Sequence, residues 1–166
     1  MKLYDYLDSG NGYKVRLTLA HLGLACEWTE CDILHGATRT PEFLARNPNG
    51  RIPLLELDDG TCIAESNAII WYLAEGSPLV PYERLARAQV LQWMFFEQYS
   101  HEPYVATPRY IVKHLPVGSP RRAELPDRLE RGRAAFTVME RHLTTRRFFV
   151  GERYTIADIS LYAYSH

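Results

Sequence analysis

The stretch that decides the fold is residues 49–66, which read NGRIPLLELDDGTCIAES. Two short runs, Leu54–Leu57 and Thr61–Ala64, flank the turn Asp58-Asp59-Gly60, and this pattern predicts a β-hairpin. Pro53 cannot donate a hydrogen bond to a strand ladder, so it marks the point where the hairpin begins.

A helix is predicted directly after the hairpin. Ser66 is a residue type preferred at a helix N-cap, and residues 67–75 are apolar nearly all round, so this helix is expected to be buried. Towards the N-terminus the pattern predicts a strand over Lys2–Tyr6, a turn at 8–12, a helix closed by Gly23, a strand over Glu27–Cys31 and a short helix from Thr40 to about Arg46. The order β-α-β, α, β-β-α predicts an α/β thioredoxin-like domain.

The second half of the chain has no strand signals before its end. Residues 82–100 read as a helix with Leu85, Ala88, Leu91 and Phe95 along one side, and Pro103 and Pro108 are expected to bend or interrupt its continuation. The apolar spacing from Leu125 to Leu143 predicts an amphipathic helix that packs on a neighbour. A final helix is predicted to begin within residues 154–158.

A short segment containing Gly76, Pro78 and Pro81 separates these halves. It predicts a thioredoxin-like domain over residues 1–76, a linker over 77–82 and an all-helical domain over 83–166. Residues 1–80 hold 6 Lys and Arg against 11 Asp and Glu, whereas residues 81–166 hold 13 against 9. The halves therefore carry net charges of −5 and +4.

Composition excludes several classes of protein. The 166 residues are 46% hydrophobic and 23% charged, which suits a globular protein. The net charge of −1 gives no overall positive electrostatic field that would attract nucleic acid. No apolar run is long enough for a membrane span or a secretion signal, so a cytoplasmic protein is expected. Three cysteines not in CxxC spacing exclude a disulfide framework or a cysteine zinc site, and the scattered histidines predict no metal site.

The loop before the first helix is the first candidate site. A thioredoxin-like domain commonly places a CxxC motif there, where the helix N-terminus stabilises a thiolate. This chain has Ser9-Gly10-Asn11-Gly12 instead, so any thiol must come from a ligand. Ser9 could offer such a ligand a hydroxyl and Asn11 an amide. The competing interpretation is a plain helix-initiating turn, and a dinucleotide-binding loop is disfavoured because Val15 occupies the third glycine position.

Two further features follow in the hairpin region. Ile52-Pro53 occupies the place of a cis proline beside the thiol site of thioredoxin-like domains, where the Ile52 backbone can pair with a peptide-like ligand. Glu65-Ser66 opens a helix whose N-terminus suits a carboxylate, although Ser66 could equally be an ordinary N-cap. The three features together predict a binding site for a thiol peptide.

With these residues in place, the whole chain resembles the glutathione S-transferase family. The motifs that carry the resemblance are residues 41–48, PEFLARNP, residues 49–55, NGRIPLL, and residues 64–69, AESNAI. Thr155-Ile156-Ala157-Asp158 resembles the structural capping box of the family's helical domain, and the loop from Ser9 resembles the bacterial nu-class pattern.

The resemblance implies roles for single residues. Ser9 and Asn11 are the expected catalytic residues that contact the glutathione thiol, ranked above Tyr13, which lies inside the predicted helix. Ile52 and cis Pro53 would hold the cysteinyl part of glutathione, and Glu65 and Ser66 its γ-glutamyl end. Arg51, or less favourably Arg39, would hold its glycyl carboxylate or peptide backbone, with a solvated surface charge as the alternative for either arginine. Residues 99–104 and Tyr110 are candidates for lining a second pocket, with core packing as the alternative for each.

The implied function is activation of the glutathione thiolate for attack on a small hydrophobic electrophile. A glutathione-dependent disulfide oxidoreductase and a non-catalytic binding module remain as alternatives. The resemblance also implies a homodimer, and the opposite charges of the two halves are compatible with one. Because family members usually run longer, it further implies that the helical domain is incomplete at its C-terminus.

Overall fold

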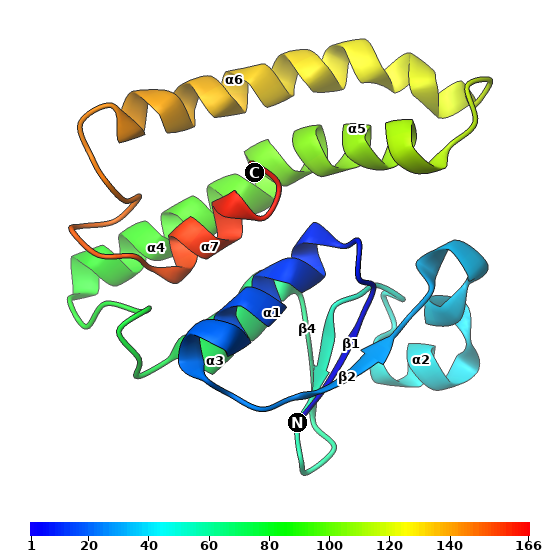
Figure 1. Cartoon of the computed structure of the whole chain (residues 1–166), viewed down its shortest axis with the longest axis horizontal. Coiled ribbons are helices and arrows are strands. Elements are labelled where there is room, and N and C mark those ends of the chain that lie inside the picture. Colours follow the sequence, from blue (N-terminus) through cyan, green and yellow to red (C-terminus); the bar gives the residue numbers. More distant parts are fainter. The chain divides into compact units, whose positions relative to one another are not determined.

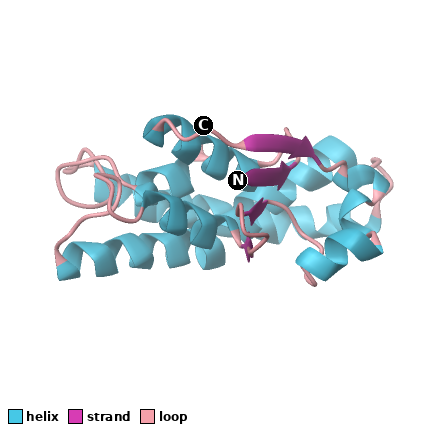
Figure 2. Ribbon diagram, turned by 90° about the horizontal axis from the view of Figure 1, so that it is seen from below, coloured by secondary structure: helices cyan, strands magenta, loops and turns pink.

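The chain divides into two compact units, Met1–Val80 and Pro81–His166, in a computed structural model that describes all of residues 1–166. All strands belong to the first unit, and the second unit consists of helices and loops (Figure 2). No helix combines the length and the apolar character needed to cross a bilayer.

A mixed sheet organises the first unit. Its strands are β1 (Lys2–Asp5), β2 (Glu27–Glu30), β3 (Leu54–Glu56) and β4 (Cys62–Ala64), in the spatial order β2-β1-β3-β4. β1 and β2 are parallel, whereas the β1–β3 and β3–β4 pairs are antiparallel. The predicted hairpin and β-α-β unit are confirmed, and each strand ends within about a residue of its predicted bounds.

Helices cover both faces of this sheet (Figure 1). α1 (Gly10–Leu22) packs beside α3 (Ser66–Ala74) on one face, and α2 (Pro41–Arg46) lies on the other. Since side chains alternate along a strand, Tyr4 and its partner Leu54 face α2, where Phe43 packs edge-on to Tyr4 with ring centroids 6.3 Å apart. The thioredoxin-like arrangement predicted from the sequence is therefore present.

Two details of α3 differ from the prediction. The helix is not buried all round, because Ala68 and Tyr72 are exposed while Ile69 and Ile70 are buried. Ser66 is not its N-cap either: Ser66 is the first helical residue, and Glu65 occupies the cap position with a positive φ of 67°. The helix therefore begins one residue earlier than the residue type suggested, directly after the unusual backbone conformation of Glu65.

The second unit begins with a nearly continuous helical run. α4 (Arg84–Phe96) leads through the π-helical segment η3 (Glu97–His101) into α5 (Glu102–His114). The regular helix is thus interrupted just before Pro103, which sits in the first turn of α5, where a missing N–H costs least. Pro108 does not interrupt the chain, since it lies inside α5.

The remaining helices are α6 (Leu125–Leu143), whose predicted bounds are confirmed, and α7 (Ile156–Tyr162). α5 packs along α6 so closely that a Cβ on Gly132 would lie 2.7 Å from the carbonyl oxygen of Tyr104. The predicted capping box at α7 is confirmed, because Thr155 N donates to Asp158 Oδ2 over 2.8 Å while the Thr155 side chain accepts from the helix backbone.

Candidate functional site

The strand register brings the three predicted site segments to one end of the sheet. β1 leads directly into the Ser9 loop, and its residue Tyr4 pairs with Leu54, the first residue of β3. Leu54 also pairs with Ala64, the last residue of β4. The loop before β3, with Ile52-Pro53, and the segment after β4, with Glu65-Ser66, therefore lie at the end of the sheet where β1 terminates. We call this end the site edge (Figure 1).

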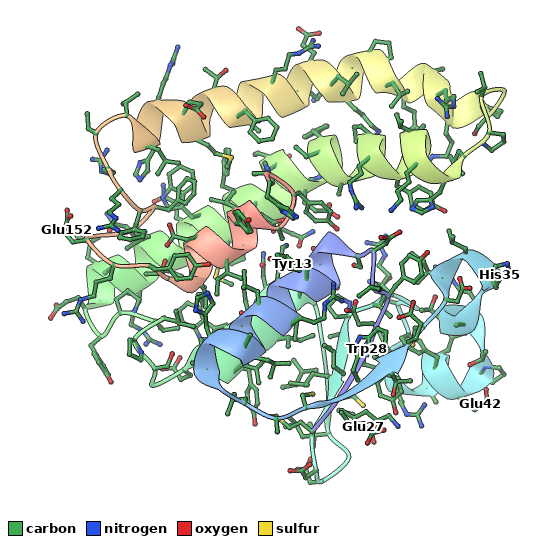
Figure 3. All side chains as sticks on the ribbon, viewed as in Figure 1. Tyr13, Glu27, Trp28, His35, Glu42 and Glu152 are labelled. Carbon is green, nitrogen blue, oxygen red and sulfur yellow. The ribbon has the colours of Figure 1, made fainter.

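Ser9 and Asn11 both lie at the N-terminus of α1. Ser9 is the N-cap, and its Oγ accepts a hydrogen bond from Gly12 N over 3.1 Å. The turn interpretation of Ser9 is thus correct as far as it goes. Asn11 is half-buried, and its Oδ1 accepts from the Ser66 hydroxyl over 3.2 Å. Tyr13 lies within α1, as expected, and is labelled on that helix in Figure 3.

The buried carboxylate of Asp5 stabilises the turn that leads from β1 into α1. Asp5, at the end of β1, is fully buried and forms an ion pair with Arg16 of α1. A Cβ placed on Gly12 would lie 1.6 Å from Asp5 Oδ1, so only glycine fits there. Arg16 also donates to the carbonyl of Leu7 over 2.8 Å. The Asp5–Arg16 pair therefore ties β1, the loop and the first turns of α1 together.

Ser66 connects the α1 and α3 ends of the site. Its side chain is buried, and its Oγ lies 3.4 Å from Lys14 Nζ as well as 3.2 Å from Asn11 Oδ1. Lys14 is completely buried. The structure thus unites the predicted thiol contact Asn11 with the predicted carboxylate contact Ser66 through a direct hydrogen bond.

The loop before β3 has the predicted cis peptide bond between Ile52 and Pro53. Ile52 lies two residues before Leu54, the first paired residue of β3, and packs against the cluster around Tyr4 and Phe43. The Arg51 side chain is exposed, and its carbonyl accepts from Asn47 Nδ2 over 2.8 Å.

Arg39, the weaker candidate, holds the same loop from outside. Its Nη1 donates to the carbonyl of Asn49 over 3.3 Å. Gly50 has a φ of 60°, which favours glycine, and a Cβ there would lie 3.0 Å from the carbonyl oxygen of Thr38. Arg39 thus braces the loop rather than standing apart as a solvated surface charge.

Glu65 has the only positive φ among the non-glycine residues. Its φ of 67° and ψ of 113° lie outside the ordinary regions, and its side chain makes no capping hydrogen bond to α3. Backbone of this kind costs about 1–3 kcal/mol and is concentrated at functional sites. Glu65 is thus an exposed carboxylate on a strained backbone directly before α3.

None of the chain's cysteines shows the properties of an activated nucleophile. Cys26, Cys31 and Cys62 carry free thiols, and burial raises the pKa of each above its ordinary value. A reactive cysteine has a lowered pKa instead. No group of three or more His, Cys, Asp or Glu side chains is placed to hold a metal ion. The site can therefore work on a thiol only if a ligand brings it.

The candidates for a second pocket behave differently from one another. His101 is completely buried, and its ring lies 5.5 Å from that of Phe136 while its Nε2 lies 3.0 Å from Ser165 Oγ. It belongs to the core of the helical unit. Tyr99, by contrast, is 83% exposed and is available to a ligand.

Lys14 is the site residue that the sequence analysis missed. It follows Asn11 by three positions, so both side chains lie on the same face of α1. In the sequence, the available signal was the position of this lysine on the same helix face as Thr18. In the structure, the Thr18 hydroxyl donates to the Lys14 carbonyl.

A thioredoxin-like unit followed by an all-helical unit is the architecture of glutathione S-transferases, and the chain belongs to this family. Residues 1–75 match the family model for the glutathione S-transferase N-terminal domain, and residues 122–164 match the model for the C-terminal domain.

Similar proteins agree with this assignment. The crystal structure of a glutathione S-transferase from Pseudomonas fluorescens superposes with a TM-score of 0.95 and 54% identity, over 99% of this chain and 82% of that one. A glutathione transferase from Phanerochaete chrysosporium, solved in complex with oxidized glutathione, gives a TM-score of 0.88 and 30% identity over 99% and 77%. Elongation factor 1-gamma from Equus caballus is 37% identical over 162 residues, which are 96% of this chain and 36% of that protein. The chain thus spans about a third of the curated relatives that it matches.

Proposed function

We propose that this protein binds glutathione at the site edge and activates its thiol for attack on a small hydrophobic electrophile. The observation that carries the proposal is the Ser66–Asn11 hydrogen bond, which joins two of the three predicted binding segments in one polar cluster. The structural neighbour with bound oxidized glutathione supports the choice of ligand.

Each segment has a part in this proposal. Glu65 and Ser66 hold the γ-glutamyl end, with the carboxylate at the N-terminus of α3, where backbone N–H groups and the helix dipole favour an anion. Ile52 and Pro53 hold the cysteinyl part by backbone pairing. Arg51, whose exposed side chain stands at this loop, holds the glycyl carboxylate.

The chemistry then depends on the thiol pKa. A free thiol has a pKa of about 8.5, so most of it is protonated at neutral pH. Hydrogen bonds from Asn11 or Ser9 and the dipole of α1 favour the anion, and each pKa unit corresponds to about 1.4 kcal/mol. The sulfur forms a bond to the electrophilic carbon, the leaving group departs with the bonding electrons, and the thiol proton passes to solvent.

The direct test measures glutathione binding by calorimetry and turnover with a chlorinated nitroaromatic. We expect binding at or below millimolar concentration and release of chloride in step with conjugate formation. No binding at millimolar glutathione would refute the proposal.

A second candidate is glutathione-dependent reduction of small disulfides. One observation favours it: the neighbour that holds oxidized glutathione. The glutathione thiolate would attack the substrate disulfide, form a mixed disulfide and release one thiol. A second glutathione would then release the other thiol and leave oxidized glutathione. Parallel assays with a chlorinated aromatic and a small disulfide separate this activity from conjugation.

A non-catalytic module is the third candidate. It is favoured by the match to a protein named as an elongation factor rather than as a transferase. Retained glutathione binding without turnover of either substrate would support this function.

We also propose that the protein is a cytoplasmic homodimer. Leu85 and Phe95 of α4 are 72% and 69% exposed, with Leu91 between them on the same side of the helix. Burial of this apolar stripe against a second copy would remove it from water. Gel filtration of the wild type should give a dimer, and Phe95→Glu should give a monomer.

A further inference from the structure

Lys14 is a charged side chain in a place where charges are rarely found. It lies in the second turn of α1 and is 0% exposed. Burial of an ammonium group is unfavourable unless hydrogen bonds replace its water. One of those bonds goes from Nζ to the Ser66 Oγ, across 52 residues of sequence. The cost of burying this charge indicates a function beyond filling space.

The hydrogen bond from Lys14 determines which group donates and which accepts in the cluster of Lys14, Ser66 and Asn11. A protonated lysine has three donors and no acceptor, so Ser66 Oγ must accept from it. The single hydroxyl proton of Ser66 is then given to Asn11 Oδ1, 3.2 Å away. Hydrogen bonds therefore run one way, from Lys14 through Ser66 to Asn11.

This direction fixes the orientation of the Asn11 amide. Because Oδ1 accepts from Ser66, the end of the amide that remains for a further ligand is its donor, Nδ2. A thiolate is stabilised by donors and destabilised by acceptors. An amide turned the other way would present its oxygen and raise the thiol pKa.

We propose that Lys14 is a positioning residue that sets the orientation of Asn11 through Ser66 and so keeps an amide donor directed at the glutathione thiolate. This role rests on the proposed function. It also links the two ends of the ligand, because Ser66, whose backbone N–H at the N-terminus of α3 is assigned to the γ-glutamyl carboxylate, is the middle member of the relay through its hydroxyl. Lys14 itself touches neither the thiol nor the electrophile in this assignment.

The test compares wild type with Lys14→Met, which keeps the length and apolar stem but has no donor. Glutathione binding and the pH dependence of kcat are measured first on wild type, since kcat reports ionisations in the bound complex. We expect the acid limb of the kcat profile to move up by about one pH unit in Lys14→Met, with about a tenfold lower kcat on the acid side of both limbs. The ultraviolet absorbance of the bound thiolate should show the same shift.

Three further variants isolate the mechanism. Lys14→Arg also donates only, so it should restore the wild-type acid limb. Adding Asn11→Ala to Lys14→Met should give the pH profile of Asn11→Ala alone, because the lysine acts through that amide. Lys113→Met, at an exposed position in α5, is the matched control and should leave the profile unchanged. If Lys14→Met does not fold, Lys14→Gln takes its place, because a glutamine can also accept and leaves the direction of the relay unset.

The possible failures are distinguishable. Wild type that does not bind glutathione overturns the proposed function and this role with it. Active wild type with an acid limb that coincides with that of Lys14→Met or Lys14→Gln overturns only the role of Lys14. A shift of equal size in the Asn11→Ala background also overturns it, since Lys14 would then act by another route.

Discussion

The N-termini of α3 and α7 start from similar residues and serve different purposes. At α7, Thr155 caps the helix and Asp158 accepts from Thr155 N, Thr155 Oγ1 and Phe149 N at 2.8 to 3.0 Å. At α3, Glu65 makes no capping bond, and Ser66 directs its hydroxyl to Asn11 on another helix.

The difference lies in where the side-chain oxygens point. The α7 terminus satisfies its own backbone, is buried, and has a structural role. At the α3 terminus, the Ser66 hydroxyl donates to α1, and Glu65 is held in a strained conformation. The backbone N–H groups in the first turn of α3 therefore receive no cap from the Glu65 side chain. Residue type at a helix start is therefore a weaker guide to function than the destination of each hydrogen bond.

The largest effect is expected from removing the capping box at the N-terminus of α7. Asp158→Ala leaves buried donors without their acceptor and should lower the free energy of unfolding by about 3 kcal/mol. Urea unfolding followed by tryptophan fluorescence measures it. Asp127→Ala, which removes an exposed partner of Arg131, should cost at most about 0.5 kcal/mol. Equal losses of unfolding free energy in the two variants would show that the capping box stabilises the fold no more than an exposed ion pair does.

Where Asn11 of α1 meets Ser66 of α3, the main effect should be on turnover. Asn11→Ala removes the proposed donor to the thiolate and should lower kcat by about 10- to 100-fold. Tyr13→Ala, two residues further inside α1, should lower it less. Steady-state kinetics of both variants decide the ranking, and an equal or reversed order would reject Asn11 as the thiol contact.

Glu65→Gly should separate stability from binding. Glycine tolerates a φ of 67°, so the variant should gain about 1 kcal/mol of stability while its glutathione binding weakens. Glu75→Gly at the other end of α3, where φ is −56°, should lose about as much stability. Calorimetric binding and thermal unfolding measure the two effects. Tighter binding by Glu65→Gly would contradict the assigned role of Glu65.

The smallest effect is expected at a third helix start, which is exposed. Glu124 precedes α6, and hydrogen bonds from Arg121 and Arg128 lower the pKa of its carboxyl. A carboxyl whose folded pKa lies below its unfolded pKa adds stability above the unfolded value, and this is lost as the pH falls through the folded value. Glu124→Gln should therefore remove a small part of the stability lost on acidification. Unfolding curves at pH 6 and below should show it, and an unchanged acid slope would refute it.

Much of the fold was accessible from the sequence because its signals are local. The turn Asp58-Asp59-Gly60 between two apolar runs predicted the hairpin, and the apolar spacing along α6 predicted that helix. The capping box was predicted for the same reason, since Thr155 and Asp158 are three residues apart.

Non-local contacts explain what was missed. Ser66 was predicted to be a cap because of its residue type, but its hydroxyl is used by Lys14 and Asn11, which are more than fifty residues away. The role of Lys14 depends on that pairing. His101 was a pocket candidate until its burial beside Phe136 and Ser165 placed it in a core.

The separation between Asn11 and Ser66, 55 residues, also has a kinetic meaning. Contacts so distant in sequence form only after the loop-closure entropy of the intervening chain has been overcome. The proposed glutathione site cannot exist until the C-terminal hairpin and helix of the first unit have docked onto its N-terminal strand and helix. A ligand that recognises only this assembled edge stabilises the finished unit by mass action, by about 2.7 kcal/mol at a hundredfold excess over its Kd. Glutathione would then serve the protein as a folding ligand as well as a substrate.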